Sequence, residues 1–227
     1  MLAAQLKAHA PASGWNWLNQ LVEDDYAIVK GLVPDELTLR LAHEARDFHE
    51  NAMMERAGVG RADDFQLASS LRRDKTLWFD RASTAQSDYL DLMESVRLTM
   101  NRELFLGLFS YEAHYAAYER GGFYKRHLDA FRGVRNRVLS TVFYLNDDWQ
   151  PGDGGELAIY NSDRINASTV MSVLPEFGTM VIFLSEEIPH EVMPTQRTRY
   201  SIAGWFRVND RMTAPGLQAP SPIVADF

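Results

Sequence analysis

The spacing of hydrophobic and polar residues divides the chain into a helix-rich first half and a strand-rich second half. Amphipathic spacing predicts short helices over residues 2–9 and 15–22, and apolar residues predict a strand over 26–31. A longer helix is expected to begin after Pro34, where proline and acidic residues form the first turn, and to run to about residue 56. Another is expected from residue 83 to about Phe109.

Beyond Phe109 the pattern changes to short apolar or alternating segments. Turn-rich pieces such as Gly121-Gly122, Pro151-Gly-Asp-Gly-Gly155 and Pro175-Glu-Phe-Gly178 separate these segments. About eight short strands joined by such turns predict a sandwich or jelly roll. The strands are expected at residues 110–118, 123–129, 137–146, 154–160, 168–175, 179–185, 188–194 and 199–207.

Composition and charge narrow the class of protein. A formal net charge of −8 argues against a nucleic-acid binder that relies on bulk electrostatics. The absence of cysteine excludes disulfides, thiolate metal ligands and a thiol nucleophile. The longest apolar runs, such as Met180 to Leu184, are far shorter than the ~18–20 residues of a membrane span, and the first residues show no signal peptide. We therefore expect a cytoplasmic protein that binds neither nucleic acid nor membranes.

Two histidines and an aspartate have the spacing of a metal site. His127 and Asp129 lie two residues apart in a predicted strand, so their side chains should point to one face. His190 follows a buried strand later in the chain. Two histidines and one carboxylate form the facial triad of non-haem Fe(II) oxygenases, which leaves positions on the metal open for reactants. The sequence thus predicts an iron site.

Arg199 is a candidate anion ligand. Alternation in the last predicted strand places Arg199, Ser201, Ala203 and Trp205 on one face. A buried arginine requires a compensating anion, and its planar guanidinium suits a carboxylate. The alternative is a surface arginine at the end of a strand.

Five short motifs in the second half of the chain form a family signature. They are His127-Leu-Asp129, Tyr144-Leu-Asn-Asp-Asp-Trp149, Gly154-Gly-Glu-Leu157, Pro189-His-Glu-Val192 and Arg199-Tyr-Ser-Ile-Ala-Gly-Trp205. In order and spacing they resemble the 2-oxoglutarate- and Fe(II)-dependent prolyl 4-hydroxylases, in the branch of the hypoxia-sensing prolyl hydroxylases and their bacterial relatives. The similarity extends from about residue 70 to residue 207.

The resemblance implies a mainly β (α+β) fold, a double-stranded β-helix or jelly roll with N-terminal helices. It implies that His127, Asp129 and His190 hold Fe(II) and carry the catalysis. The residues implied at the cosubstrate are Arg199 and Tyr144 on the distal carboxylate of 2-oxoglutarate, Tyr118 beside it, and Leu157 and Trp205 as apolar walls. The residues implied at the substrate are Arg72, Asp74, Trp78 and Arg137.

The resemblance also implies an organisation for the chain. We expect a single domain over residues 1–227, with a helical annex and edge strand over 1–109 and a catalytic core over 110–207. A tail would cover 208–227. Within the annex, residues 58–78 are expected to form a lid over the substrate, because a polar run there precedes a segment that resembles the family's closing loop.

The implied reaction is 4-hydroxylation of a prolyl residue in a protein target. Fe(II), 2-oxoglutarate and O2 would be required, ascorbate would be supportive, and succinate and CO2 would be released. The bacterial relatives suggest elongation factor Tu as one target, and we expect a monomer. One alternative is a hydroxylase of a free amino acid or small molecule on the same iron site.

Two alternatives lie outside the oxygenases. A non-catalytic cupin-like jelly roll is disfavoured, because such a barrel needs no dicarboxylate clamp of the kind that Arg199 and Tyr144 would form. A zinc hydrolase is disfavoured because the chain has no His-Glu-x-x-His pair.

Two features near the expected site have open interpretations. His114 has the strand parity of Tyr118 and could face the same pocket. The cation-rich segment from Arg120 to Arg137 is either a solvated rim or a basic collar that steers an acidic protein segment to the site. Its cations are Arg120, Lys125, Arg126, Arg132, Arg135 and Arg137.

Overall fold

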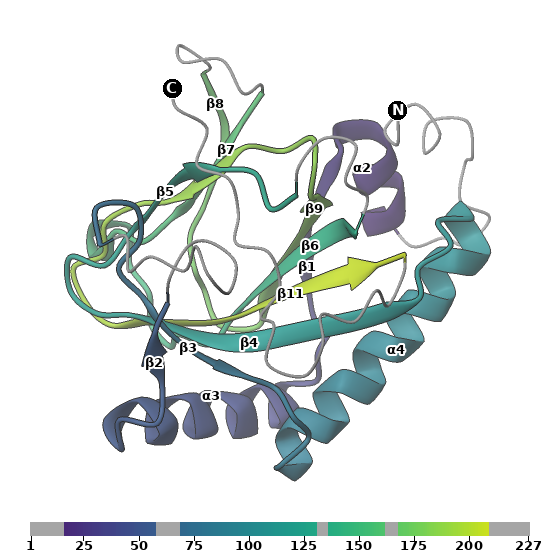
Figure 1. Ribbon diagram of the computed structural model, residues 1–227. Helices are drawn as coiled ribbons and strands as arrows, with labels where there is room; N and C mark the ends of the chain where they lie inside the picture. Colours follow the sequence, from purple (N-terminus) through teal and green to yellow (C-terminus); the bar gives the residue numbers. More distant parts are fainter. Residues whose placement is uncertain (1–15, 58–68, 131–135, 162–167, 209–227) are drawn as a thin grey trace, which may run out of the picture.

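Two β-sheets and the helices that cover one of them make up the described part of the protein (Figure 1). The computed structural model describes residues 16–57, 69–130, 136–161 and 168–208. Within these ranges a seven-stranded sheet has the order β1-β9-β6-β11-β4-β3-β2, and a four-stranded sheet has the order β5-β10-β7-β8. The pairings are antiparallel, and the mainly β, double-stranded β-helix fold expected from the sequence is confirmed.

From residue 110 onward each predicted segment contains one strand, although several strands are shorter than predicted. Those of the larger sheet are β1 (Tyr26–Lys30), β2 (Glu55–Arg56), β3 (Lys75–Trp78), β4 (Ser110–Tyr118), β6 (Arg137–Tyr144), β9 (Thr179–Leu184) and β11 (Arg199–Arg207). Those of the smaller sheet are β5 (Tyr124–His127), β7 (Leu157–Tyr160), β8 (Thr169–Val173) and β10 (His190–Val192). A short 3-10 turn, η2 (Pro151–Asp153), precedes β7.

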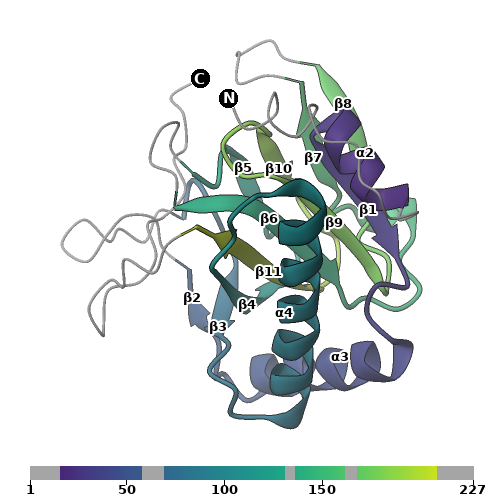
Figure 2. The same ribbon diagram turned by 90° about the vertical axis from the view of Figure 1, so that its right-hand side faces the viewer.

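Helices α3 (Asp35–Glu50) and α4 (Thr84–Leu104) cover the outer face of the larger sheet, and α2 (Asn16–Asp24) packs beside β1 (Figures 1 and 2). Helix α4 begins where the Ser83 side chain accepts a hydrogen bond from the Gln86 N–H at 3.0 Å. It ends at Leu104 rather than near Phe109, because Phe105 adopts a left-handed conformation (φ 53°).

Alternation in β11 separates the helix-covered face of the larger sheet from the face that carries the site. Ile202 and Phe206 are fully buried toward the helices, where the ring of Tyr111 lies 4.6 Å from that of Phe206. The residues at the other parity, Arg199, Ser201, Ala203 and Trp205, line a cavity between the sheets. The predicted separation of the two faces is therefore confirmed.

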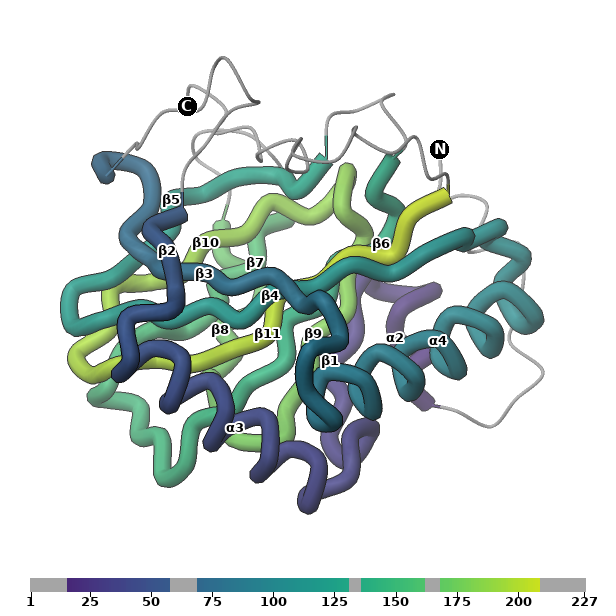
Figure 3. The backbone as a smooth tube through the Cα atoms, turned by 60° about the horizontal axis from the view of Figure 1, so that its bottom comes forward, coloured from purple at the N-terminus to yellow at the C-terminus, as the bar shows by residue number. Residues whose placement is uncertain are grey.

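The first half of the chain departs from the prediction in two further places. Helix α3 ends at Glu50, six residues early, and β2 occupies residues 55–56 instead. Residues 75–78 were expected in the lid, but they form β3, which pairs with β4 and carries β2 at the sheet edge (Figure 3). The strand is only four residues long, so its formation depends on the edge of β4 that it completes. Residues 58–68 of the predicted lid lie outside the described residues, as do the predicted helix at 2–9 and the tail from 209.

The described helices include none with the length and apolar character needed to cross a membrane.

Gly204 allows the close packing of the larger sheet. A Cβ atom at this position would lie 2.1 Å from the hydroxyl oxygen of Tyr111, which is held at 2.8 Å from Thr141 Oγ1. Because the tyrosine is fixed, we expect Gly204→Ala to lower the free energy of unfolding by about 1–3 kcal/mol in urea denaturation. Gly152→Ala is the matched control: its Cβ would meet no atom within 4 Å, so a change below about 0.5 kcal/mol is expected. Equal effects of the two substitutions would contradict this account of the packing.

Candidate active site

Pairing between β5 and β10 brings the two candidate metal-binding histidines together. His190 is the register partner of His127, and their ring centroids lie 4.2 Å apart. Asp129 lies between them, with its carboxylate oxygens 3.6 Å from His127 Nε2 and 3.7 Å from His190 Nε2. One ligand atom from each of the three residues falls within 4.8 Å of the others, so a single ion could contact all three.

Asp129 reaches this site from beyond the strand end rather than from within a strand. Strand β5 ends at His127, and Asp129 sits in the bend that follows. The predicted strand 123–129 is therefore too long, although the expectation that both side chains share one site holds. The backbone of the bend is tied to the larger sheet, because Ala130 N–H donates to Ser185 O at 3.2 Å.

The second nitrogen of each histidine is held by a backbone carbonyl. His127 Nδ1 lies 2.7 Å from Lys125 O, and His190 Nδ1 lies 3.1 Å from Ile188 O. Carbonyl oxygens only accept, so each Nδ1 carries the proton and each Nε2 presents its lone pair to the space shared with Asp129. Carbonyl partners of this kind fix the tautomer and the ring orientation of metal-binding histidines.

Burial and charge favour the protonation states that bind a metal. Burial and the neighbouring His127 lower the pKa of His190 to about 4, so its imidazole is neutral near pH 7. Burial alone would raise the pKa of Asp129, but His190 and His127 hold it below its usual range. Neutral imidazole and carboxylate donors in a buried, thiolate-free site suit Fe(II).

Arg199 lies in the same cavity with part of its guanidinium unpaired. Its Nε donates to Gly155 O at 2.9 Å and its Nη1 to Ser201 Oγ at 3.1 Å. Its Nη2 is buried and has no hydrogen-bond partner among the described residues. The side chain is only 1 % exposed, so an anion must complete its surroundings. The alternative of a surface arginine is wrong.

Tyr144 supplies a second unpaired donor next to this guanidinium. Its ring centroid lies 5.0 Å from the Arg199 guanidinium carbon, and that of Tyr118 lies 5.1 Å away. The Tyr144 hydroxyl is buried without a partner among the described residues. Burial raises the pKa of Tyr144 to about 12, although the charge of Arg199 acts in the opposite direction, so the hydroxyl retains its proton. Two orphaned donors beside each other suit one carboxylate.

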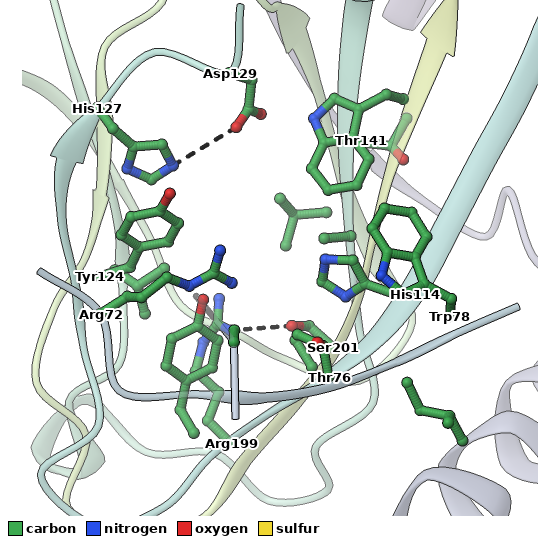
Figure 4. Close-up of a pocket in the computed structure, with 18 of the residues that line it drawn as sticks. Arg72, Thr76, Trp78, His114, Tyr124, His127, Asp129, Thr141, Arg199 and Ser201 are labelled. Carbon is green, nitrogen blue, oxygen red and sulfur yellow. Dashed lines mark hydrogen bonds and ion pairs between the residues drawn. The ribbon is translucent and has the colours of Figure 1, made fainter. Parts of the chain in front are cut away.

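The triad residues and Arg199 line one cavity of about 390 Å³ (Figure 4). His127 and Asp129 lie at one end, and Arg199 with Ser201 at the other. A cavity of this volume falls within the range of small-molecule sites. Of the residues predicted for the site, the structure places these along the cavity: Arg72, Trp78, Tyr118, His127, Asp129, Arg137, Leu157, His190, Arg199 and Trp205.

Two predicted residues do not line the open cavity. Tyr144 lies behind it, against Arg199. Asp74 is buried beneath it, where it accepts hydrogen bonds from Arg72 Nε at 2.7 Å and Nη2 at 2.5 Å. Asp74 is therefore positioned to orient Arg72, and its own side chain does not face the active-site cavity.

One wall of the cavity is aromatic. His114 faces the cavity, as its strand parity allowed, and its ring makes an edge contact with Trp78 at 4.9 Å and a tilted contact with Trp205 at 5.4 Å. His114 Nδ1 donates to Tyr115 O at 3.0 Å. Burial lowers the pKa of His114 to about 4, so the ring is neutral. This wall stands opposite Tyr124 and Arg72 (Figure 4).

Tyr124 was not predicted as a site residue, and a β-bulge explains why. Residues 124 and 127 of a regular strand point to opposite faces. Here three steps along β5, from Tyr124 to His127, oppose two steps along β10, from Val192 to His190. The bulge turns both side chains to one side, and the two rings stack 3.6 Å apart.

The described cations of the segment from Arg120 to Arg137 differ in burial and in their partners. Arg137 is 3 % exposed, bonds to Glu112 at 2.9 Å and lies 3.7 Å above the Trp205 ring. Arg126 lies over the Tyr160 ring at 3.4 Å. Arg120 and Lys125 are exposed, while Arg132 and Arg135 lie outside the described residues. Burial and pairing thus separate Arg137 from its exposed neighbours.

The fold and the triad define a class of protein, the double-stranded β-helix proteins that bind a metal through two histidines and a carboxylate. Within this class, residues 113–207 match the model of the 2OG-Fe(II) oxygenase superfamily. A crystal structure of a Pseudomonas putida prolyl-4-hydroxylase is 35% identical in sequence, with a TM-score of 0.74, and the alignment covers 92% of this chain and 100% of that one. The chain belongs to the 2OG-Fe(II) oxygenase superfamily, whose cofactors are Fe(II), 2-oxoglutarate and O2.

Other relatives are more distant or much longer. A prolyl hydroxylase from Trichoplax adhaerens, in complex with a hypoxia inducible factor peptide, has a TM-score of 0.72 at 21% identity, over 91% of this chain and 89% of that one, and shows the shared fold. Egl nine homolog 1 of Homo sapiens is 27% identical over 79% of this chain, and prolyl 3,4-dihydroxylase OGFOD1 of Ostreococcus tauri is 38% identical over 34%. The chain spans only 43% and 17% of their respective lengths.

We expect each of His127→Ala, Asp129→Ala and His190→Ala to remove stoichiometric binding of Mn(II), a redox-inert substitute for Fe(II). Loss of one of three ligands leaves too few donors to hold a labile ion. Binding is measured by calorimetry or by the paramagnetic resonance of free Mn(II). His114→Ala is the matched control, because it removes a buried histidine of the same cavity outside the triad. Wild-type Mn(II) affinity in Asp129→Ala would remove that residue from the site.

Proposed function

We propose that the protein is a 2-oxoglutarate- and Fe(II)-dependent dioxygenase that hydroxylates a prolyl residue of a protein target at the 4-position. The observation that carries the proposal is the presence of the triad and an incomplete carboxylate site in one cavity. The similarity to the Pseudomonas putida prolyl-4-hydroxylase over its full length supports the choice of a prolyl substrate.

This chain offers candidate ligands both for the metal and for the cosubstrate that the family's chemistry requires. His127, Asp129 and His190 would hold Fe(II). Arg199 Nη2 and the Tyr144 hydroxyl, which lack partners among the described residues, would donate to the distal carboxylate of 2-oxoglutarate. When bound, Fe(II) supplies oxidising chemistry in which O2 and 2-oxoglutarate convert a C–H bond to C–OH with release of succinate and CO2.

The side chains around the cavity position the reactants and exclude water. Leu157, Val142 and Val192 contribute apolar surface, and Trp78 and Trp205 provide flat walls. A prolyl ring is compact and apolar, so it suits a space between aromatic side chains. Arg72 and Arg137, fixed by Asp74 and Glu112, are positioned to donate hydrogen bonds to the carbonyl groups of a bound chain.

The geometry bears on the alternatives of different class. Each buried donor without a partner lowers the stability of the fold by about 1–3 kcal/mol. In a non-catalytic jelly roll, the unpaired Arg199 Nη2 and Tyr144 hydroxyl would bring this cost without any function. A hydroxylase of a free amino acid would use the same iron and cosubstrate residues. The substrate experiment below therefore distinguishes the protein target from the small molecule.

If Arg199 and Tyr144 together clamp the distal carboxylate, substitutions at the two positions should weaken 2-oxoglutarate binding to different extents. Arg199→Ala should weaken affinity for 2-oxoglutarate by about 2–5 kcal/mol, because truncating one member of a buried charge pair leaves the other unpaired. Tyr144→Phe loses a single hydrogen bond to a charged acceptor and should cost less, about 1.5–3 kcal/mol. Titration of the Mn(II)-loaded protein measures both values, with Tyr160→Phe as control because its hydroxyl bonds to Glu191 instead. Unchanged affinity in Arg199→Ala would exclude the clamp.

The reaction is tested by mass spectrometry of candidate proteins, elongation factor Tu among them, after incubation with enzyme, Fe(II) and 2-oxoglutarate. We expect one added oxygen on a proline, which amino-acid analysis should identify as 4-hydroxyproline. His190→Ala serves as the inactive control. Efficient hydroxylation of free proline, equal to that of any protein, would favour the small-molecule alternative.

A further inference from the structure

A second cavity adjoins the active site beside β3 and the turn between β4 and β5. Its volume is about 350 Å³. Its lining residues are Arg56, Ala57, Ser69, Arg72, Arg73, Asp74, Lys75, Ala117, Glu119, Arg120, Gly121 and Gly122. Arg56, Ala57 and Arg72 also line the active-site cavity, so the two spaces adjoin at that edge. We call the second cavity the basic groove.

The basic groove carries an excess of positive charge that is not neutralised internally. Five of its side chains are basic and two are acidic. Asp74 is occupied by Arg72 at 2.5 Å, and Glu119 by Lys75 at 2.6 Å. The remaining cations, Arg56, Arg73 and Arg120, are exposed and form no ion pair with a described residue.

This excess contrasts with a chain whose formal net charge is −8. Such a local reversal of sign attracts an anionic partner to one place on an otherwise acidic surface. It also disfavours nucleic acid, because a polyanion would extend beyond the groove over a chain that repels it.

Backbone hydrogen bonds connect the segments that line the basic groove. Ala57 N–H donates to Asp74 O at 3.0 Å and Arg73 N–H to Phe123 O at 2.8 Å, which join β2, β3 and the segment before β5. Gly122 permits the contact between the turn and β3, since a Cβ there would lie 2.7 Å from Glu119 O and 2.9 Å from Arg73 O. The backbone that carries Arg56 and Arg73 is therefore held in place, so this backbone need not be ordered when a partner binds.

We propose that the basic groove binds acidic side chains that flank the target proline, and so selects protein segments with Asp or Glu near that proline. The inference rests on the proposed prolyl hydroxylase function and deepens it. An extended chain advances about 3.3 Å per residue, so residues within a few positions of a proline in the active-site cavity can reach the adjoining basic groove. The groove's unpaired guanidinium groups suit carboxylates of such residues.

The test uses a pool of synthetic peptides, each with one central proline and with Asp, Asn or Ala at the flanking positions. Mass spectrometry identifies the peptides that gain oxygen in the presence of the Fe(II)- and 2-oxoglutarate-supplied protein. We expect hydroxylated peptides to be enriched on the order of tenfold in Asp over Asn on one side of the proline at low salt. The enrichment should decrease as salt rises, because the Debye length falls to about 3 Å at 1 M.

Two double variants test whether the basic groove causes the preference for Asp over Asn. Arg73→Glu combined with Arg120→Glu should abolish the preference for Asp over Asn or invert it. Arg81→Glu combined with Arg102→Glu changes the net charge equally at exposed positions outside the groove, and should keep the wild-type preference. The ratio of Asp to Asn peptides is the readout, because damage to folding or to the active site lowers both together.

A binding measurement separates failure of this inference from failure of the proposed function. Fluorescence anisotropy reports binding of Asp-rich and Asn-matched peptides to Mn(II)- and 2-oxoglutarate-loaded protein, in which no turnover occurs. Selective binding that the groove variant loses supports the basic groove even if no proline is oxidised. Equal binding of both peptides, or a preference that survives in the groove variant, overturns it. So does stronger binding of a single-stranded oligonucleotide that displaces the Asp-rich peptide.

Discussion

The antiparallel pairing of β5 with β10 is the constraint on which the site depends. It sets His190 opposite His127, although the two are far apart in the chain, and the bend after β5 then brings Asp129 between them. Backbone carbonyls within the same two segments fix both imidazoles. A slip of one residue in this register would direct one histidine to the opposite face and leave no site for an ion.

The larger sheet carries a buried positive charge, the Arg199 guanidinium, which the described residues do not fully compensate. Arg199 donates hydrogen bonds to Gly155 and Ser201, and its Nη2 has no partner among the described residues. An unpaired group at such depth lowers the stability of the fold. This loss of stability is consistent with a site that a small dicarboxylate completes. Tyr144 places a second unpaired donor next to the same guanidinium.

Strand alternation predicted much of the site from the sequence, since it acts on adjacent residues and needs no knowledge of the partner strands. It placed Arg199, Ser201 and Trp205 on one face and Ile202 on the other, as observed. It could not reveal Tyr124, because a bulge in β5 changes the parity on which the method relies. The polar run and the resemblance to a closing loop, rather than alternation, assigned residues 75–78 to a lid, whereas these residues pair with the edge of β4 as a strand.

Charge patterns were the least informative part of the sequence. Arg137 and Arg120 stand in one cation-rich run, yet Arg137 is buried against Glu112 and Trp205, whereas Arg120 faces the basic groove. The partners that decide these outcomes come from other strands. By itself the sequence predicted the three candidate metal ligands, the buried arginine and the β-rich fold, because strand alternation and side-chain chemistry can be read without knowledge of the partner strands. Only the tertiary structure decided which cations are neutralised, which donors stay unpaired and which two cavities adjoin, because these depend on contacts between residues far apart in the chain.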